Sequence, residues 1–342
     1  MLLVYIDHFG GKAPTVAWEA LGAGTRLAAG SELKAVVMGQ GVEALASEAV
    51  SRGAHSVLLA DDDRLKEFRP EVYADGLSEI IRQSGADTVL FPTTSRAREL
   101  AAMVAVDLGT GITPDAIQLA RQNGAIVATR PIYAGKLLTT EVNLAHRPQV
   151  LTVRSRSFPA PEPDPARAGE ITRVELDLGQ PRTDVLGYKP SGGGVSLAEA
   201  AIIVSGGRGV ANNPTLQPPP ELTGEKEQEI WRAREGFKLV GELAKVLGGA
   251  VGASRAAVDA GYIPYSYQVG QTGKVVSPDL YIACGISGAI QHLAGMRTAK
   301  TIVAINKDPD APIFKLARFG VVGDLHQILP ALIGVLRQRL GK

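Results

Sequence analysis

Residues 252–314 include Gly-Ala-Ser-Arg (252–255), Val-Gly-Gln-Thr-Gly (269–273), Gly-Ile-Ser-Gly-Ala-Ile-Gln-His (285–292) and Ile-Asn-Lys-Asp (305–308). Each of these motifs is flanked by an apolar, strand-like run or by a helical pattern. This alternation predicts a parallel sheet whose ligand-binding turns follow the carboxyl ends of its strands. A ligand that contacts several such turns must be long, and a dinucleotide with a central pyrophosphate fits best.

Two of the Gly-rich turns are candidate phosphate sites. The turn after the strand at 280–284 leads into an expected helix at 287–294, whose first N–H groups would hold an anion. Ser287 could donate to that anion, or it could simply cap the helix. A weaker candidate, Val-Ser-Gly-Gly-Arg-Gly (204–209), also follows a strand. It lacks the Gly-x-Gly-x-x-Gly pattern, so Arg208 is either a phosphate contact or a surface arginine on a tight turn.

Other polar residues of this region have both a functional and a purely structural explanation. His292 lies in the expected helix 287–294, and Arg255 lies at a strand-to-helix turn. Asn306 ends a strand, at the edge where α/β sheets bind ligands. Asp324 begins the last helix, where capping would explain it equally well.

The composition is that of a globular protein. Of 342 residues, 45% are apolar and 21% are charged, and the formal net charge of +1 gives no reason to expect a nucleic-acid partner. One cysteine excludes a disulfide framework and a cysteine-based metal site. No apolar run approaches the roughly 20 residues that span a bilayer, and nothing resembling a leader precedes the first strand. We therefore expect a cytoplasmic protein without a metal site or membrane insertion.

The chain predicts two α/β domains, the first with an antiparallel extension. In the first hundred residues, the expected strands are 2–6, 33–38, 56–60 and 88–92, and the expected helices are 15–29, 42–52, 71–84 and 96–107. This order favours a sheet with helices on both faces. Four strands at hairpin spacing follow, at 116–119, 125–132, 136–142 and 149–154, with turn signals at 123–124 and 134–135.

A proline-rich run at 158–167 and a Gly-rich run at 188–194 separate the two halves, with a single strand at 171–176 between them. We place the domain boundary at 190, which gives an N-terminal domain 1–190 and a C-terminal domain 191–342. The C-terminal half again alternates. Its expected strands are 201–204, 280–284 and 301–305, and its expected helices are 227–247, 287–294 and 324–339.

The combination of motifs resembles a known family. Residues 252–261, 268–274, 285–292 and 305–308 are closely similar to the large (alpha) subunit of the electron-transfer flavoproteins. The resemblance is dense from 246 to 330 and looser over 1–190. It implies a C-terminal parallel-sheet domain that binds FAD and an N-terminal scaffold that packs on a beta subunit as a heterodimer. It also implies a redox carrier rather than a substrate-converting enzyme.

The resemblance assigns roles to particular residues. Arg255 would lie by the flavin ring, Thr272 near N5 with Gln271 beside it, and His292 at the N1/O2 edge. Ser287 and the N–H groups of Gly288 to Gln291 would take the ribityl and pyrophosphate part. Arg208, Ser254, Asn306, Asp324 and Leu325 would line the adenosine and phosphate end. The complete implied set is Arg208, Ser254, Arg255, Gly270, Gln271, Thr272, Ser287, Gly288, Ala289, Ile290, Gln291, His292, Asn306, Asp324 and Leu325.

The implied roles suit one-electron chemistry. An added electron places negative charge on the N1/O2 edge of a flavin, where a guanidinium and an imidazole would stabilise it. At an effective dielectric constant of about 20, one charge at about 4 Å contributes up to about 4 kcal/mol. No acid–base or nucleophilic group is needed, because the redox chemistry belongs to the cofactor.

The implied function is to accept electrons from flavin dehydrogenases, such as the acyl-CoA dehydrogenases of fatty acid beta-oxidation, and to pass them singly to a quinone-linked or other acceptor. Two alternatives stay open: a relay in an NADH-dependent bifurcating complex, and a non-redox dinucleotide-binding scaffold. The chain departs from the family's short form at 211–232, about twenty additional residues after Arg208. This departure leaves open both the position of Arg208 and the branch of the family.

Overall fold

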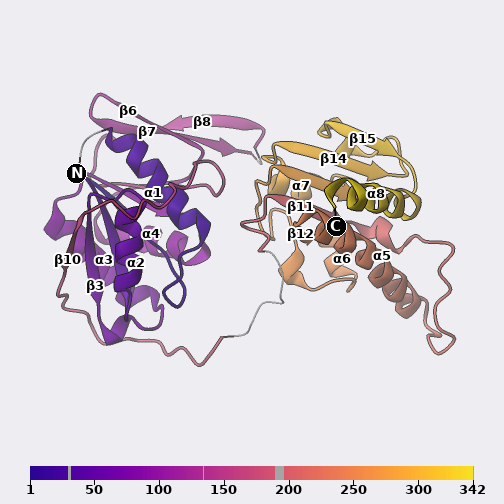
Figure 1. Cartoon of the computed structure of the whole chain (residues 1–342), viewed down its shortest axis with the longest axis horizontal. Coiled ribbons are helices and arrows are strands. Elements are labelled where there is room, and N and C mark those ends of the chain that lie inside the picture. Colours follow the sequence, from indigo (N-terminus) through magenta and orange to yellow (C-terminus); the bar gives the residue numbers. More distant parts are fainter. Residues whose placement is uncertain (30–31, 134, 189–195, 342) are drawn as a thin grey trace. The chain divides into compact units, whose positions relative to one another are not determined.

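The computed structural model describes residues 1–29, 32–133, 135–188 and 196–341, and the chain divides into two compact units (Figure 1). The first unit comprises Met1–Ile132 and Leu137–Lys189, and the second comprises Tyr133–Lys136 and Pro190–Lys342. The Gly-rich run in which we place the domain boundary lies, apart from Tyr188, outside the described residues.

The first unit is built on a seven-stranded sheet of order β10-β3-β2-β1-β4-β9-β5, in which all neighbouring strands are parallel. Its strands are β1 (Leu2–Tyr5), β2 (Leu33–Gly39), β3 (Ser56–Asp61), β4 (Thr88–Pro92), β5 (Ile112–Ala116), β9 (Gln149–Val153) and β10 (Glu170–Arg173). The expected alternation of strands and helices is confirmed for the first hundred residues.

Helices cover both faces of this sheet, because both faces of its strands are apolar. Leu2 and Val4 join the core formed with α1 and α2, whereas Leu3 and Tyr5 join the core formed with α3 and α4. A strand buried on both sides reads as a continuous apolar run. The helices are α1 (Thr15–Ala28), α2 (Glu43–Ser51), η1 (Asp63–Leu65), α3 (Pro70–Ser84) and α4 (Ser95–Asp107).

A three-stranded antiparallel sheet extends the first unit. It consists of β6 (Gln118–Gln122), β7 (Ala125–Ile132) and β8 (Leu137–Glu141), with β7 in the middle. Asn123 and Gly124 join β6 to β7 with positive φ angles of 48° and 77°, as a tight hairpin turn requires. This hairpin was expected. The second turn signal, at 134–135, lies partly outside the described residues.

Two of the strands expected at hairpin spacing are placed differently. The segment 149–154 is not antiparallel, because β9 pairs in parallel with β4 and β5 inside the large sheet. All five residues of β9 are buried, which is typical of a central parallel strand. The expected strand 116–119 is divided between β5, which ends at Ala116, and β6, which begins at Gln118. The short spacing between these segments suggested hairpins. It gave no sign that the chain returns to the seven-stranded sheet at β9.

The second unit contains a five-stranded parallel sheet of order β12-β11-β13-β14-β15. Its elements are β11 (Ile202–Gly206), η2 (Arg208–Ala211), α5 (Glu225–Leu247), β12 (Ala250–Ala253), α6 (Arg255–Asp259), η3 (Tyr265–Tyr267), β13 (Leu280–Cys284), α7 (Ile290–Met296), β14 (Thr301–Asn306), η4 (Pro312–Lys315), β15 (Phe319–Val322) and α8 (Leu325–Leu340). β15 was not expected, and the strand now seen as β12 was implied only by the strand-to-helix turn at Arg255, without bounds.

The core of the second unit also lies on both sides of its sheet. One side packs against α5 and α8 and includes Val204 and Ile282. The other side packs against α7 and η4 and includes Ile203 and Tyr281. Within the described part of the chain, no helix combines the length and apolarity that crossing a membrane would need.

Candidate dinucleotide-binding site

The strand order of the five-stranded sheet reverses between β11 and β13. β11 is followed along the chain by β12 on one side, whereas β13 is followed by β14 on the other side. Connections that leave in opposite directions open a crevice at the carboxyl ends of the two strands, where α/β sheets bind ligands. The turns 207–209 and 285–288 follow these two strands directly, so both candidate phosphate turns lie at this crevice.

The two turns pack backbone against backbone. The N–H of Gly207 donates to the carbonyl oxygen of Cys284 at 2.9 Å, and the N–H of Gly209 donates to that of Gly285 at 3.2 Å. A Cβ atom added to Gly207 would lie 2.2 Å from the carbonyl oxygen of Gly285, so no larger residue fits. Arg208 lies between the two glycines, and its side chain is 63% exposed.

Residues from two other strand ends lie close to the 285–288 turn. The Nδ2 atom of Asn306, at the end of β14, donates to the carbonyl oxygen of Ile286 at 3.0 Å. A Cβ atom added to Gly285 would lie 3.0 Å from a methyl carbon of Leu325. The preceding residue, Asp324, caps α8 by accepting from the N–H of His326 at 2.9 Å.

Ser254 lies at the end of β12. Its N–H donates to the carbonyl oxygen of Gly206 at 3.0 Å, which ties it to the 207–209 turn. Its hydroxyl accepts from the N–H of Ala257 at 3.3 Å and so caps α6. Asp324 and Ser254 thus both have the capping role that is their ordinary structural explanation. The structure nevertheless gathers Arg208, Ser254, Asn306, Asp324 and Leu325 at one edge of the sheet.

The helix after β13 begins three residues later than expected. α7 starts at Ile290 with Ala289 as its N-cap residue, so Ser287 does not cap it. Gly288 has a φ of +89°, in the left-handed region, and this backbone conformation prevents the helix from starting earlier. The side chain of Ser287 is exposed, and its carbonyl oxygen accepts from the N–H of Ile313 at 3.0 Å.

The late start of α7 leaves a run of free backbone donors. Among the described residues, no acceptor is found for the N–H groups of 287–291. The first bonds of the helix come from His292 and Leu293, both to the carbonyl oxygen of Ala289, at 2.9 and 3.0 Å. Successive free N–H groups form a concave site for an anion. Because α7 has only seven residues, these N–H groups, and not a helix dipole, are the basis for a phosphate site.

The loop 270–273 lies against the beginning of α7. The N–H of Gln271 donates to the carbonyl oxygen of Gln291 at 2.8 Å. A Cβ atom added to Gly295 would lie 2.3 Å from the backbone nitrogen of Gly270, so the loop and the helix approach through two glycines. The side chains of Gln271 and Thr272 are exposed, as are those of Ala289 and Ile290 nearby.

Arg255 is the first residue of α6. Its Nε atom lies 3.1 Å from a carboxylate oxygen of Asp259, and both side chains are 61% exposed. Within the described residues, no hydrogen bond or ion pair joins Arg255 to the 270–273 loop or to His292. The family resemblance implies that these residues surround one ring, and the bonds of the structure join only the loop to the turn of α7 that carries His292.

His292 is buried in the first turn of α7, with 5% of the residue exposed. Its Nε2 atom lies 3.0 Å from the hydroxyl oxygen of Tyr281, itself fully buried. Burial lowers the pKa of His292 to about 4, so its imidazole is neutral at pH 7. A neutral imidazole acts through hydrogen bonds. At pH 7 this residue therefore carries no formal positive charge.

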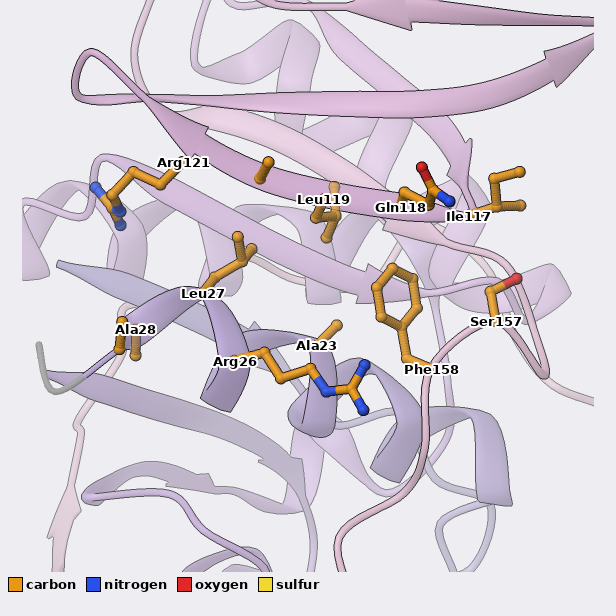
Figure 2. Close-up of a pocket in the computed structure, with 12 residues that line it drawn as sticks. Ala23, Arg26, Leu27, Ala28, Ile117, Gln118, Leu119, Arg121, Ser157 and Phe158 are labelled. Atoms are coloured by element: carbon orange, nitrogen blue, oxygen red, sulfur yellow. The ribbon is translucent and has the colours of Figure 1, made fainter.

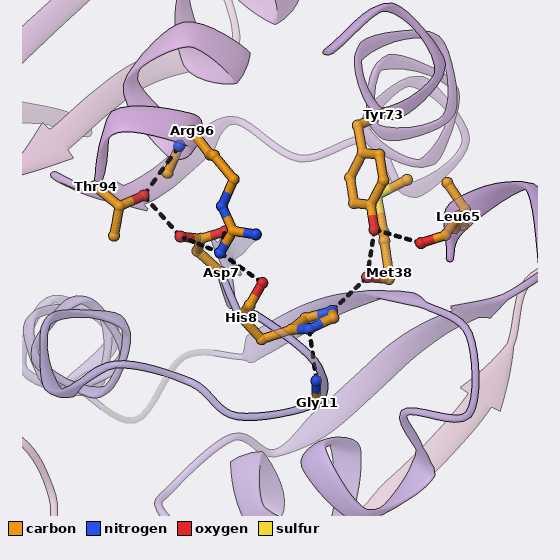
Figure 3. Close-up of polar contacts among 9 residues, drawn as sticks. Asp7, His8, Gly11, Met38, Leu65, Tyr73, Thr94 and Arg96 are labelled. Carbon is orange, nitrogen blue, oxygen red and sulfur yellow. Dashed lines mark hydrogen bonds and ion pairs between the residues drawn. The ribbon is translucent and has the colours of Figure 1, made fainter. Parts of the chain in front are cut away.

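The first unit has a switch in strand order as well, between β1 and β4, but its own side chains fill the position (Figure 3). The buried carboxylate of Asp7 accepts from the hydroxyl of Thr94 at 2.7 Å and pairs with Arg96 at 3.2 Å. The Arg96 guanidinium also lies 5.5 Å from the ring centres of Phe9 and Phe68. The charged groups there neutralise one another.

The first unit also contains a cavity of about 600 Å³ between α1 and β6 (Figure 2). Leu27, Leu119 and Phe158 provide apolar walls, and the exposed side chains of Arg26 and Arg121 lie at its rim. The cavity lies away from the carboxyl edge of the sheet and contains none of the residues that the sequence singled out. We do not assign it to the dinucleotide.

Comparison with known proteins identifies the family of the chain. A model of the electron transfer flavoprotein domain matches residues 2–178, and a model of the electron transfer flavoprotein FAD-binding domain matches residues 231–297. An electron transfer flavoprotein subunit alpha of Bacillus subtilis (strain 168) is 42% identical over 330 residues, which cover 96% of this chain and 94% of the relative. The chain belongs to the electron transfer flavoprotein alpha-subunit family.

Other members are similarly close to this alpha subunit. The electron transfer flavoprotein subunit alpha of Thermoanaerobacterium thermosaccharolyticum is 42% identical, over 98% of this chain and 97% of its own length. Protein FixB of Clostridium saccharobutylicum is 40% identical, over 98% and 96% respectively. The resemblance in the motifs is therefore confirmed, as is the two-part α/β fold class. The family is one of electron carriers, and its cofactor is FAD.

The residues of the electron transfer flavoprotein site fit a dinucleotide. The free N–H groups of 287–291 suit a pyrophosphate, and they lie at the crevice between β11 and β13. Two features were missed from sequence. Tyr281 contacts His292 from inside a strand that reads only as apolar, and Glu229, in the additional segment 211–232, pairs with Arg208. The only sequence signal for the contact between Glu229 and Arg208 would have been the helical spacing of Glu229 relative to the residues that follow it.

Proposed function

We propose that this chain holds FAD at the carboxyl edge of its C-terminal sheet and carries electrons one at a time. In this proposal, the C-terminal domain 191–342 binds the cofactor, and the N-terminal domain 1–190 is a scaffold that packs on a beta subunit. The observation that carries the proposal is the run of free N–H groups at 287–291, located where the strand order reverses. The filled switch position of the first unit supports the division of roles.

We assign the fifteen residues of the implied set to the cofactor. The N–H groups of 287–291 bind its phosphates, and the exposed Arg208 adds positive charge at the same edge. Exposed Arg255 contributes positive charge toward the ring, while Asp259, 3.1 Å away, offsets part of that charge. Neutral His292 offers a hydrogen bond without a formal charge. The bound flavin supplies the redox chemistry.

Exposed apolar side chains support a heterodimer. Leu137 and Leu138 on β8 are 56% and 62% exposed, and Val142 and Leu144 just beyond β8 are 41% and 73% exposed. Exposed apolar side chains on and beside an edge strand are a common site of protein association. We propose that these side chains are covered by the beta subunit. The cytoplasmic location expected from the sequence stays a prediction.

A more specific part of the proposal concerns the electron donor and the electron acceptor. We propose electron uptake from flavin dehydrogenases, such as the acyl-CoA dehydrogenases of fatty acid beta-oxidation, and delivery to a quinone-linked or other acceptor. The test is to purify the chain with its beta subunit and to mix it with a dehydrogenase and its acyl-CoA substrate. Bleaching of the flavin absorbance is the expected result. A colourless protein, or bound flavin that the reduced dehydrogenase does not reduce, would refute the proposal.

A relay in an NADH-dependent bifurcating complex is the second candidate. Relatives of two names, Protein FixB and electron transfer flavoprotein subunit alpha, are 40% and 42% identical to this chain, and neither name states an electron donor. Sequence similarity therefore does not select a branch. Adding NADH to the purified pair separates the two candidates, because only the bifurcating form takes electrons from NADH.

A further inference from the structure

Arg208 is held by a carboxylate that the sequence analysis did not connect with it. Its Nη2 atom lies 3.2 Å from Oε1 of Glu229. The hydroxyl of Tyr262 donates to the same oxygen. Tyr262 is 4% exposed, whereas the side chain of Arg208 is 63% exposed. A buried phenol thus fixes a carboxylate, and that carboxylate holds the exposed guanidinium beside the 207–209 turn.

Glu229 comes from the additional segment 211–232. The last part of that segment is helical, because α5 already begins at Glu225. Glu229, Ala233 and Gly236 share one face of α5 by their spacing of four and three residues. A Cβ atom added to Gly236 would lie 2.2 Å from the carbonyl oxygen of Val210, so this face packs directly on the chain after Arg208. The extra turns of α5 carry Glu229 to the guanidinium.

The three groups are in the protonation states that this contact needs. Tyr262 and Arg208 together hold the pKa of Glu229 below its usual range, so Glu229 is a carboxylate at pH 7. Burial raises the pKa of Tyr262, so the phenol remains a donor. The guanidinium of Arg208 has two described partners, the carboxylate of Glu229 and the hydroxyl of Tyr262. Because a guanidinium has five N–H donors, several remain for a second anion.

We propose that Glu229 is a positioning residue for FAD, which holds Arg208 so that its remaining donors meet the phosphates of the cofactor. The inference rests on the proposed function and gives the segment 211–232 a role within it. A long arginine side chain loses rotamer freedom when it binds a phosphate, and prior fixation by Glu229 removes part of that cost. The negative charge of Glu229 itself opposes the phosphates, so position and charge have opposite effects on affinity.

The test is a titration of FAD into the full-length chain freed of bound FAD, with the dissociation constant read from the quenching of flavin fluorescence. Glu229→Ala is expected to raise the dissociation constant about threefold to tenfold, as for the loss of one hydrogen bond. In an Arg208→Ala background, Glu229→Ala is expected to cause no further rise. Glu229→Gln keeps the acceptor oxygen and removes the charge, and we expect its dissociation constant to stay within about twofold of the wild type.

Two variants keep the test decisive if Glu229→Ala folds poorly. Tyr262→Phe removes the hydroxyl that bonds to both Glu229 and Arg208, and it should weaken FAD binding only in chains that keep Arg208. Glu235→Ala removes another carboxylate of α5, paired with Lys238 and not with Arg208, and should leave the affinity unchanged. An unchanged dissociation constant in Glu229→Ala, or an equal rise with and without Arg208, would overturn the inference. A wild-type chain that binds no FAD would instead overturn the proposed function.

Discussion

His292 makes the C-terminal unit sensitive to acid. Its pKa is lowered to about 4 by burial, against about 6.5 for an exposed histidine. Between about pH 4 and pH 6.5, His292 is protonated in the unfolded chain but stays neutral in the folded chain. The contribution of His292 is therefore complete above pH 6.5 and is lost as the pH falls toward 4. From pH 7 to pH 5 the loss amounts to about 2 kcal/mol, at about 1.4 kcal/mol for each pKa unit.

The chain offers a way to measure this loss in one unit. It has two tryptophans, Trp18 in α1 and Trp231 in α5. In a Trp18→Phe background, the fluorescence of Trp231 therefore follows the unfolding of the C-terminal unit in urea. We expect the free energy of unfolding to fall less between pH 7 and pH 5 in His292→Gln than in the parent, by about 2 kcal/mol. Carboxylates contribute equally to both proteins and cancel in the difference.

His146→Gln serves as the matched control, because His146 is exposed and lies in the other unit. This variant should show the same loss of stability between pH 7 and pH 5 as the parent. If His292→Gln also lost as much free energy as the parent, His292 would not be buried in its neutral form, and the account of its environment would be wrong.

Three further predictions concern other parts of the chain. Asp7→Asn removes the charge that pairs with Arg96, whose side chain is 28% exposed, and should destabilise the first unit by about 1–3 kcal/mol in urea unfolding followed by Trp18 fluorescence in a Trp231→Phe background, and a change below about 0.5 kcal/mol would contradict this. Leu138→Asp on β8 should abolish copurification with the beta subunit, whereas Val106→Asp on α4, at an apolar residue that is 79% exposed against 62% for Leu138, should not, and equal behaviour of the two would refute the assigned interface. Gly207→Ala places a methyl group 2.2 Å from the carbonyl oxygen of Gly285 and should reduce FAD content after purification, whereas Gly334→Ala, in open space on α8, should retain it.

The sheet of the second unit shows what sequence alone can predict. Its long apolar strands and the Gly-rich turns after them could be read directly, because a strand buried on both faces has no polar interruptions. The short strand β15 escaped, because its four residues are all exposed and carry no pattern of burial. In the first unit, β9 was misplaced because spacing along the chain does not reveal which neighbour a strand pairs with.

The site was predicted as residue types but not as contacts. Gly288 signalled a turn, yet only the structure shows that its left-handed backbone delays α7 and frees the N–H groups of 287–291. The sequence indicated an imidazole at position 292, but only its burial against Tyr281 shows that the ring is neutral at pH 7. Such effects depend on packing between distant segments, which local sequence patterns do not encode.

Arg255 gives the most direct test of the central claim, that FAD at this site takes up electrons singly. Because its side chain is 61% exposed, its charge contributes only about 1–2 kcal/mol to an anion about 4 Å away, at a dielectric constant between about 40 and 80. The measurement is a stepwise reduction of the bound flavin, giving its two one-electron potentials, in the wild type, Arg255→Gln and Arg234→Gln, the last an exposed arginine on α5. The account predicts two resolved potentials in the wild type and a first potential lower by about 40–90 mV in Arg255→Gln only. A single two-electron step in the wild type would contradict the account.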